Sequence, residues 1–108
     1  MDFSEWKKLE LKVGKILNVE KIQRAEKLYK LRVDIGLERP IQIVTSLVQY
    51  YSQDELKDQK IIVLTNLKSA KFSGEVSEGM LLCAEKEDGS KCVLLTVQRD
   101  IEVGTPIT

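Results

Sequence analysis

The sequence has no histidine, and its only cysteines are Cys83 and Cys92. Without histidine, the Ser-His and Cys-His arrangements of nucleophilic catalysis are excluded. A zinc site with four protein ligands would need further nitrogen or sulfur ligands beyond the two cysteines, and the chain has none. No glycine-rich phosphate loop occurs in the chain either. We therefore expect no catalytic residue, no bound metal and no cofactor, so the sequence argues against an enzyme.

Long apolar runs are equally scarce. No stretch approaches the length that a membrane span requires, and residues 1–8 lack the apolar segment of a secretory signal. These features predict no membrane association and a cytoplasmic location, in which Cys83 and Cys92 remain free thiols. A disulfide between them, across a hairpin centred on Asp88-Gly89, is the alternative.

Net charge is absent from the chain as a whole but not from its parts. The 17 basic residues balance the 17 acidic ones. Between Lys7 and Arg32, however, nine cations oppose three carboxylates, which leaves +6 in this segment and −6 in the remainder. A local basic patch attracts polyanions whatever the total charge. The alternative is that these cations are only the solvated sides of two strands.

Alternating apolar residues predict β-structure at the start of the chain. The alternation that includes Leu11 and Val13 changes phase at Gly14, which indicates a bulge or bend in a strand that serves both sides of a small barrel. Polar residues 20–27 are expected to form a loop. Residues 29–35 then place apolar side chains on one face and Lys30, Arg32 and Asp34 on the other.

The remaining elements complete the pattern of a small barrel. Ser52 and Glu55 form a capping box that starts a short helix, and polar residues 68–79 are expected to form a long loop. Further strands are expected from residue 41, at 61–64, at 80–84 and, after the Asp88-Gly89 hairpin, at 93–95. This order predicts an all-β OB-fold, a five-stranded β-barrel with a short helix between strands 3 and 4 and a C-terminal hairpin extension. We expect one domain over residues 1–108, with a core of about 9–85 and an extension of 86–108.

The first group of candidate binding residues consists of cations around the first loop. Lys21, Arg24 and Lys27 fall within the predicted loop, and Lys30 and Arg32 project from the outer face of the second strand. Cations arranged in this way can neutralise successive phosphates and bind a nucleic acid without reading its sequence.

The second group follows the fourth strand and returns at the start of the fifth. Its members are Asn66, Lys68, Lys71, Ser77 and Met80. The amide and the hydroxyl can hydrogen-bond to sugar, phosphate or base edges, the lysines supply charge, and a methionine can pack against an unstacked base. The alternative makes Gly79 an ordinary turn residue and Met80 a core side chain.

Six blocks of the sequence, in order, resemble one family. They are Lys12-Val13-Gly14-Lys15-Ile16, Ala25-Glu26-Lys27-Leu28-Tyr29, Ile43-Val44-Thr45-Ser46-Leu47-Val48, Tyr51-Ser52, Asn66-Leu67-Lys68 with Lys71, and Ser77-Glu78-Gly79-Met80-Leu81-Leu82. Together they resemble the tRNA-binding domain of methionyl-tRNA synthetases, which also occurs as a free-standing tRNA-binding protein or a separate synthetase β subunit. The chain differs at Ile22-Gln23-Arg24, where the family often has His-Pro-Asn, and at Thr45-Ser46, where it often has Ser-Gly.

The resemblance implies an OB-fold that holds tRNA by its overall shape, with little sequence reading. It places tRNA contacts at Lys27, Asn66, Lys68, Lys71, Ser77 and Met80. It also implies a homodimer joined through the C-terminal region and, as a further partner, a methionyl-tRNA synthetase catalytic chain. One branch of the family implies an alternative, a peptide-binding chaperone linked to protein export.

Overall fold

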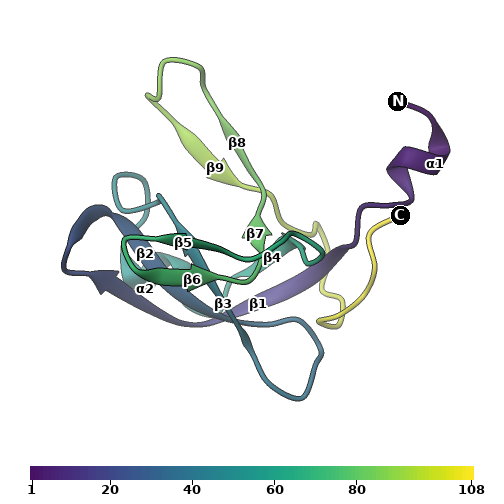
Figure 1. Ribbon diagram of the computed structural model, residues 1–108, viewed down its shortest axis with the longest axis horizontal. Helices are drawn as coiled ribbons and strands as arrows, with labels where there is room; N and C mark the ends of the chain where they lie inside the picture. The colour runs from purple at the N-terminus through teal and green to yellow at the C-terminus, as the bar shows by residue number, and fades with distance from the viewer.

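The computed structural model describes residues 1–108 and is built mainly of β-strands (Figure 1). In chain order the elements are α1 (Phe3–Trp6), β1 (Leu11–Ile22), β2 (Ala25–Asp34), β3 (Ile41–Thr45), α2 (Gln53–Leu56), β4 (Lys60–Leu64), β5 (Ala70–Phe72), β6 (Glu75–Ser77), β7 (Met80–Leu81), β8 (Cys83–Glu85) and β9 (Cys92–Leu94). The predicted OB-type order is confirmed, with α2 between β3 and β4. Neither helix has the length and apolar character needed to cross a bilayer.

Five antiparallel strands form the main sheet in the order β3-β2-β1-β4-β7. The long strand β1 serves two neighbours, as predicted: residues 11–15 pair with β4, and residues 15–22 pair with β2. The predicted bulge at Gly14 is misplaced, because the register shifts between Ile16 and Asn18 instead. Gly14 allows close packing, since a Cβ there would meet Val33 and Val63 atoms at 3.0 Å each.

The barrel closes by a few single contacts between β3 and the chain around β6 and β7. The Glu78 amide donates to the Gln42 carbonyl at 2.7 Å, and the Gln42 amide donates to Glu78 Oε1 at 2.9 Å. Two residues further along β3, the Val44 amide donates to Ser77 Oγ at 3.0 Å. In a fully closed barrel, the backbone amides of Gln42 and Val44 would pair with the backbone of a neighbouring strand. Here the side chains of Glu78 and Ser77 accept their hydrogen bonds instead.

Alternate residues of β2 explain how the barrel is filled. Tyr29, Leu31 and Val33 are buried in the main core, while Lys30 and Arg32 between them point outward. The helix α2 adds Leu56, whose side chain is fully buried. Its predicted capping box is confirmed, with the Glu55 amide donating to Ser52 Oγ at 3.2 Å.

Two segments that the sequence predicted to be loops are hairpins instead. Strand β1 continues to Ile22 and β2 begins at Ala25, so that only Gln23 and Arg24 form the turn. Residues 70–77 form the β5–β6 hairpin, whose turn residues Ser73 and Gly74 have φ values of 51° and 82°. Two positive φ angles are typical of the type I′ turn, which matches the twist of a tight hairpin.

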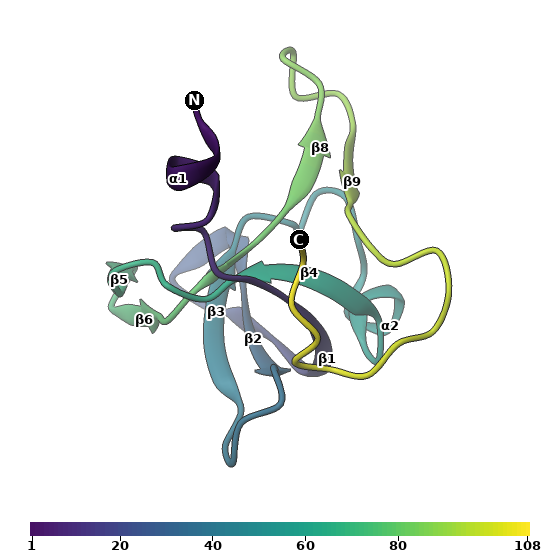
Figure 2. The same ribbon diagram turned by 90° about the vertical axis from the view of Figure 1, so that its right-hand side faces the viewer.

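The C-terminal hairpin is confirmed, but the strand predicted at 80–84 splits at Leu82. The Leu82 amide donates to Ile62 in the barrel, and the Leu82 carbonyl accepts from Leu95. Beyond this point β8 and β9 stand away from the barrel (Figures 1 and 2). The tail then returns along β1, where the Val13 amide donates to the Thr105 carbonyl at 3.0 Å.

Candidate functional site

The outer side of β2 and β3, together with the β5–β6 hairpin, gathers cations from separate parts of the sequence. Lys30 and Arg32 point outward because their neighbours in β2 fill the core. The hairpin is fixed beside β3, where Gln42 Nε2 donates to the Val76 carbonyl at 2.8 Å. We call this surface the cation face. Its cations are Arg24, Lys30, Arg32, Arg39, Lys68 and Lys71.

A polar hollow of about 580 Å³ lies in the cation face. Its lining residues are Arg32, Arg39, Pro40, Gln42, Leu67, Ser69, Val76 and Glu78. Lys68 sits between two of these residues in the chain, and Lys71 lies opposite Val76 in the β5–β6 hairpin. Four of the lining side chains, those of Arg32, Arg39, Gln42 and Ser69, donate hydrogen bonds or carry positive charge, against the one carboxylate of Glu78, which suits an anionic ligand.

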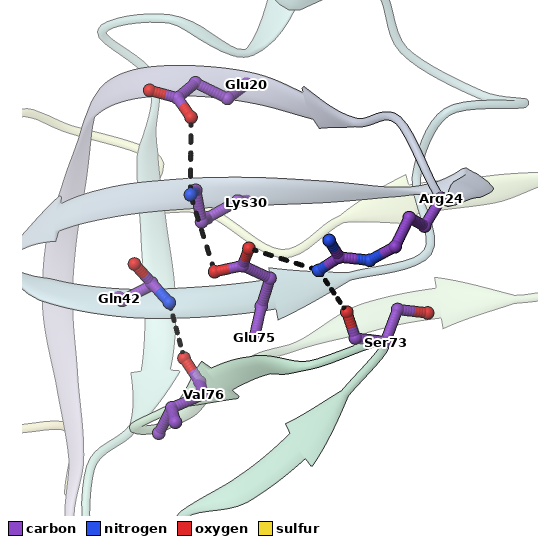
Figure 3. Close-up of polar contacts among 7 residues, drawn as sticks. All are labelled: Glu20, Arg24, Lys30, Gln42, Ser73, Glu75 and Val76. Atoms are coloured by element: carbon purple, nitrogen blue, oxygen red, sulfur yellow. Dashed lines mark hydrogen bonds and ion pairs between the residues drawn. The ribbon is translucent and has the colours of Figure 1, made fainter.

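Three carboxylates lie among these cations, and Figure 3 shows the network that two of them make. Glu75 lies 3.5 Å from Lys30 Nζ through Oε1 and 3.8 Å from Arg24 through Oε2. Lys30 also meets Glu20 at 3.4 Å, and Arg24 Nη2 donates to the Ser73 carbonyl at 2.9 Å. The network joins the β1–β2 turn to the β5–β6 hairpin.

The third carboxylate, Glu78, lies 3.3 Å from Arg39 Nη2. Three of the six cations of the face are thus held by carboxylates, and no ion pair involves Arg32, Lys68 or Lys71. These three side chains are exposed. Within the cation face, they are the positive charges most accessible to a ligand.

Arg39 was missed by the sequence analysis because it lies outside the basic segment 7–32. The only local signal was its position just before Pro40 and the start of β3. An OB-fold usually binds its ligand on the second and third strands, so this position belongs to the expected ligand face.

Two of the predicted cations are not brought into the cation face. Lys21 lies opposite Tyr29, whose side chain is buried, so Lys21 leaves the ribbon on the other side from Lys30. Lys27 is exposed in the part of β2 between Ala25 and Tyr29, where the register with β1 is interrupted. Neither lysine forms an ion pair.

The polar groups of two uncharged candidates, Asn66 and Ser77, form hydrogen bonds within the fold. Asn66 Nδ2 donates to the Lys8 carbonyl at 2.6 Å, and its Oδ1 accepts from the Glu10 amide at 3.1 Å. Ser77 is 4% exposed, and its hydroxyl donates to the Gly79 carbonyl at 2.8 Å while accepting from β3. Met80 is half-buried against the main core. These contacts give all three residues a structural role.

A second surface feature is an apolar groove of about 560 Å³, which the sequence analysis also missed. Its lining residues are Trp6, Leu9, Leu11, Ile62, Leu64, Leu82, Leu95, Thr96, Val97 and Ile107. The signal was the unbroken apolar run of 61–64, because a strand with one solvated face alternates instead. We call this surface the apolar groove.

Neither cysteine provides a nucleophile. Both are free thiols, and Cys92 is buried. The pKa of the Cys83 thiol is raised to about 12, mainly by burial and secondly by the neighbouring Cys92. A thiol reacts as its thiolate, and the raised pKa leaves little thiolate at Cys83 near neutral pH.

Comparisons with known proteins agree on one family. A family model described as "Putative tRNA binding domain" matches residues 11–106. The methionine–tRNA ligase of Archaeoglobus fulgidus is 41% identical over 107 residues, which are 99% of this chain and 16% of the ligase. That of Methanocaldococcus jannaschii is 43% identical, with the same coverage. The chain therefore spans about a sixth of the length of these relatives.

Two solved structures have the same fold along nearly their whole length. A MetRS-related protein from Pyrococcus horikoshii is 42% identical, with a TM-score of 0.92, and the match covers 100% of this chain and 97% of that one. The CsaA chaperone protein from Picrophilus torridus is 28% identical, with a TM-score of 0.88, and the match covers 100% and 99%.

Proposed function

This chain belongs to the tRNA-binding domain family, and we propose that it binds folded tRNA through the cation face. The observation that carries this proposal is a polar hollow lined by Arg32, with Lys68 between two lining residues in the chain and Lys71 paired with the lining residue Val76. Arg32, Lys68 and Lys71 are all exposed and form no ion pair. The chain is a binding domain and not an enzyme, since it corresponds to a non-catalytic sixth of the ligases that it matches.

Binding through these residues depends on charge and shape. Each lysine or arginine that neutralises a phosphate releases counterions, which supplies affinity without reading a base. The cations come from β2, from the segment after β4 and from β5, so their spacing is set by the fold. A rigid polyanion with matching phosphate spacing can contact all of them together, whereas a flexible one loses conformational entropy in doing so.

Titration with folded tRNA at several salt concentrations tests this proposal. We expect affinity to fall steeply as salt rises, and to exceed the affinity for an unstructured RNA of equal length. Affinity that ignores salt, or that is equal for the two RNAs, would contradict tRNA recognition by shape.

The synthetase is the partner that the relatives suggest. We propose that the chain assists aminoacylation in the cytoplasm by holding tRNA near a methionyl-tRNA synthetase, either as its β subunit or as a free-standing cofactor. A second weak site raises occupancy through effective concentration and needs no new catalytic group. Adding the chain to a synthetase that lacks this domain should lower its KM for tRNA and leave kcat nearly unchanged. No change in KM would contradict an assisting role.

We also propose a homodimer, with the apolar groove at its interface. Leu95, Val97 and Ile107 of the proposed extension 86–108 line the groove beside Trp6 and residues of the proposed core 9–85. Nine of its ten lining residues are apolar, and an apolar surface of this kind is typical of a protein interface. Sedimentation of the chain should give twice the mass of 12.3 kDa. A monomer at micromolar concentration would contradict the proposal.

The apolar groove also favours a second candidate function, a peptide-binding chaperone of the same fold. In that case the groove would take an unfolded polypeptide rather than a second copy. Binding of an unfolded polypeptide in the absence of tRNA binding would support the chaperone. Binding of tRNA with no affinity for the polypeptide would exclude it.

A further inference from the structure

The polar hollow of the cation face has an apolar part that phosphate binding does not use. Leu67 and Val76 line it, and they are 46% and 37% exposed. Neither residue belongs to the hydrophobic core of the barrel. A phosphate gains nothing from contact with apolar side chains, whereas an unstacked nucleobase is stabilised when its face covers them.

Glu78 is a second feature of the hollow that does not suit a phosphate. Its side chain lines the hollow and is 30% exposed. The Gln42 amide donates to Oε1 at 2.9 Å, and Arg39 Nη2 donates to Oε2 at 3.3 Å, so the carboxylate is held in place. Because a carboxylate has about four acceptor sites, each oxygen can accept a further hydrogen bond. The group repels a phosphate but suits a ligand with two N–H donors side by side.

We propose that the polar hollow binds an unstacked guanine of the RNA, whose N1–H and N2–H donate to the Glu78 carboxylate while its face covers Leu67 and Val76. This inference rests on the proposed function, because it takes RNA as the ligand of the cation face. The volume of about 580 Å³ lies within the range of small-molecule sites, about 300–1,000 Å³, and leaves room for a base. Lys68 follows Leu67 in the chain and Lys71 pairs with Val76, so both are available for the phosphates that flank the base.

Guanine is the base that fits a carboxylate best. It alone among the four bases presents two adjacent donors on its Watson–Crick edge, the edge by which proteins read unstacked bases. Adenine and cytosine place their amino group beside a ring nitrogen that accepts, and uracil has one N–H between two carbonyls. With each of these bases, an acceptor atom would face one oxygen of Glu78 with no proton between them, which a polar site penalises. Arg39, next to Oε2, adds a donor for the guanine O6 when N1–H donates to this oxygen.

Pentanucleotides of RNA with a variable central base test this inference. Uridine occupies the other positions, and the centre is guanosine, inosine or adenosine. Inosine differs from guanosine only in lacking the N2 amino group. The wild type should bind the guanosine pentanucleotide about tenfold more tightly than the inosine one, and adenosine no more tightly than inosine. Chemical-shift titration by NMR measures the affinities, and the largest shifts should occur at Leu67 and Val76.

The variant Glu78→Gln should bring the ratio of guanosine to inosine affinity close to one. Glutamine replaces one acceptor oxygen by an amide that itself donates, so the second donor of guanine loses its partner. Glu75→Gln is the matched control, because it removes the same charge from the cation face but Glu75 does not line the hollow. This control should keep the ratio of the wild type. A wild-type ratio of one, an unchanged ratio in Glu78→Gln, or an equal fall in the control would each overturn the inference.

A second variant keeps the inference testable if Glu78→Gln fails to fold. Leu67→Ala changes an exposed side chain and should weaken the guanosine pentanucleotide about threefold, by the loss of apolar contact. A pentanucleotide with an abasic centre should bind the variant and the wild type equally. No loss with guanosine, or an equal loss with the abasic centre, would overturn a base in the hollow.

Free guanosine monophosphate distinguishes a guanine of RNA from a free nucleotide. It should bind more weakly than the guanosine pentanucleotide, since it brings fewer phosphates to the cation face. Equal affinities would make the free nucleotide the ligand and overturn the inference. Failure of the proposed function would differ, because folded tRNA would then not bind. Binding of tRNA together with equal affinities for guanosine and inosine would overturn the guanine site alone.

Discussion

The cation face and the apolar groove lie on different strands of one small barrel, and the two surfaces interact differently with water. The cation face carries charges that are partly paired with its own carboxylates, and water solvates it well when no ligand is bound. The apolar groove has no such internal partner, since nine of its ten lining residues are apolar.

This difference indicates two kinds of association. A surface whose charges already have partners can bind and release a polyanion, with affinity set by salt. An exposed apolar groove is stabilised whenever it is covered, which favours a lasting interface. We therefore expect substitutions in one surface to leave the association of the other surface unchanged, and the following predictions test this independence.

The largest effect is expected from removing the three unpaired cations together. The triple variant Arg32→Met, Lys68→Met, Lys71→Met should bind tRNA about a hundredfold more weakly near 0.15 M salt, since each phosphate contact contributes about fivefold. Equilibrium binding measures the loss, and sedimentation should show the proposed dimer unchanged. Dissociation of this variant to monomers would mean that the two surfaces are not independent.

A charge placed in the apolar groove should weaken the proposed dimer. Leu95→Asp loses the burial of a leucine and places a carboxylate in an apolar environment, so we expect the dimer to be weakened at least about thirtyfold. Leu37→Asp is the matched control, because Leu37 is 58% exposed and outside the groove. Sedimentation equilibrium of both variants would separate the effects, and equal dimer strength in the two would argue against the groove as the interface.

Ser77→Ala should affect stability more than binding. The substitution leaves the buried amide of Val44 without its acceptor, at a cost of about 1–2 kcal/mol in the free energy of unfolding. Urea unfolding measures this cost. A loss of tRNA affinity with unchanged stability would instead make Ser77 a ligand contact.

The smallest effect concerns the ion pair between Lys60 Nζ and Asp100 Oδ1, 2.8 Å apart, which links the C-terminal extension to β4. The hydrogen bond and charge of Lys60 lower the pKa of Asp100 below 3.8. A lowered pKa in the folded state stabilises the fold above pH 3.8, and this contribution is lost as the pH falls through the folded pKa. Asp100→Asn should therefore be slightly less stable than the wild type at pH 7, and the difference should vanish in acid. Urea unfolding at several pH values measures it, and a difference that persists in acid would argue against the pair.

The core of the fold could be predicted from the sequence because burial imposes a clear period. The alternation of Tyr29, Leu31 and Val33 identified β2, and the Ser52–Glu55 capping box located α2. The same capping spacing occurs at Asp2 and Glu5, where it starts α1, but no apolar run follows it and all its residues are exposed. Without burial the signal was too weak to recognise.

The candidate site was harder to predict because it depends on contacts between distant segments. Residues 20–27 appeared to be a loop, since all of them except the buried Ile22 and the half-buried Ala25 are exposed, and alternation is lost. The Ser73-Gly74 turn was a local signal of the β5–β6 hairpin. The pairing of Glu75 with Arg24, 51 positions earlier, had no local signal at all.

The most direct test of tRNA binding through the cation face is the salt dependence of tRNA affinity in the wild type and in the triple variant of Arg32, Lys68 and Lys71. The slope of log affinity against log salt should become shallower by about three, or about one for each lost phosphate contact. An unchanged slope would show that tRNA, if bound, is held by other cations, such as Lys21 and Lys27 outside the cation face, and would contradict the proposed interface.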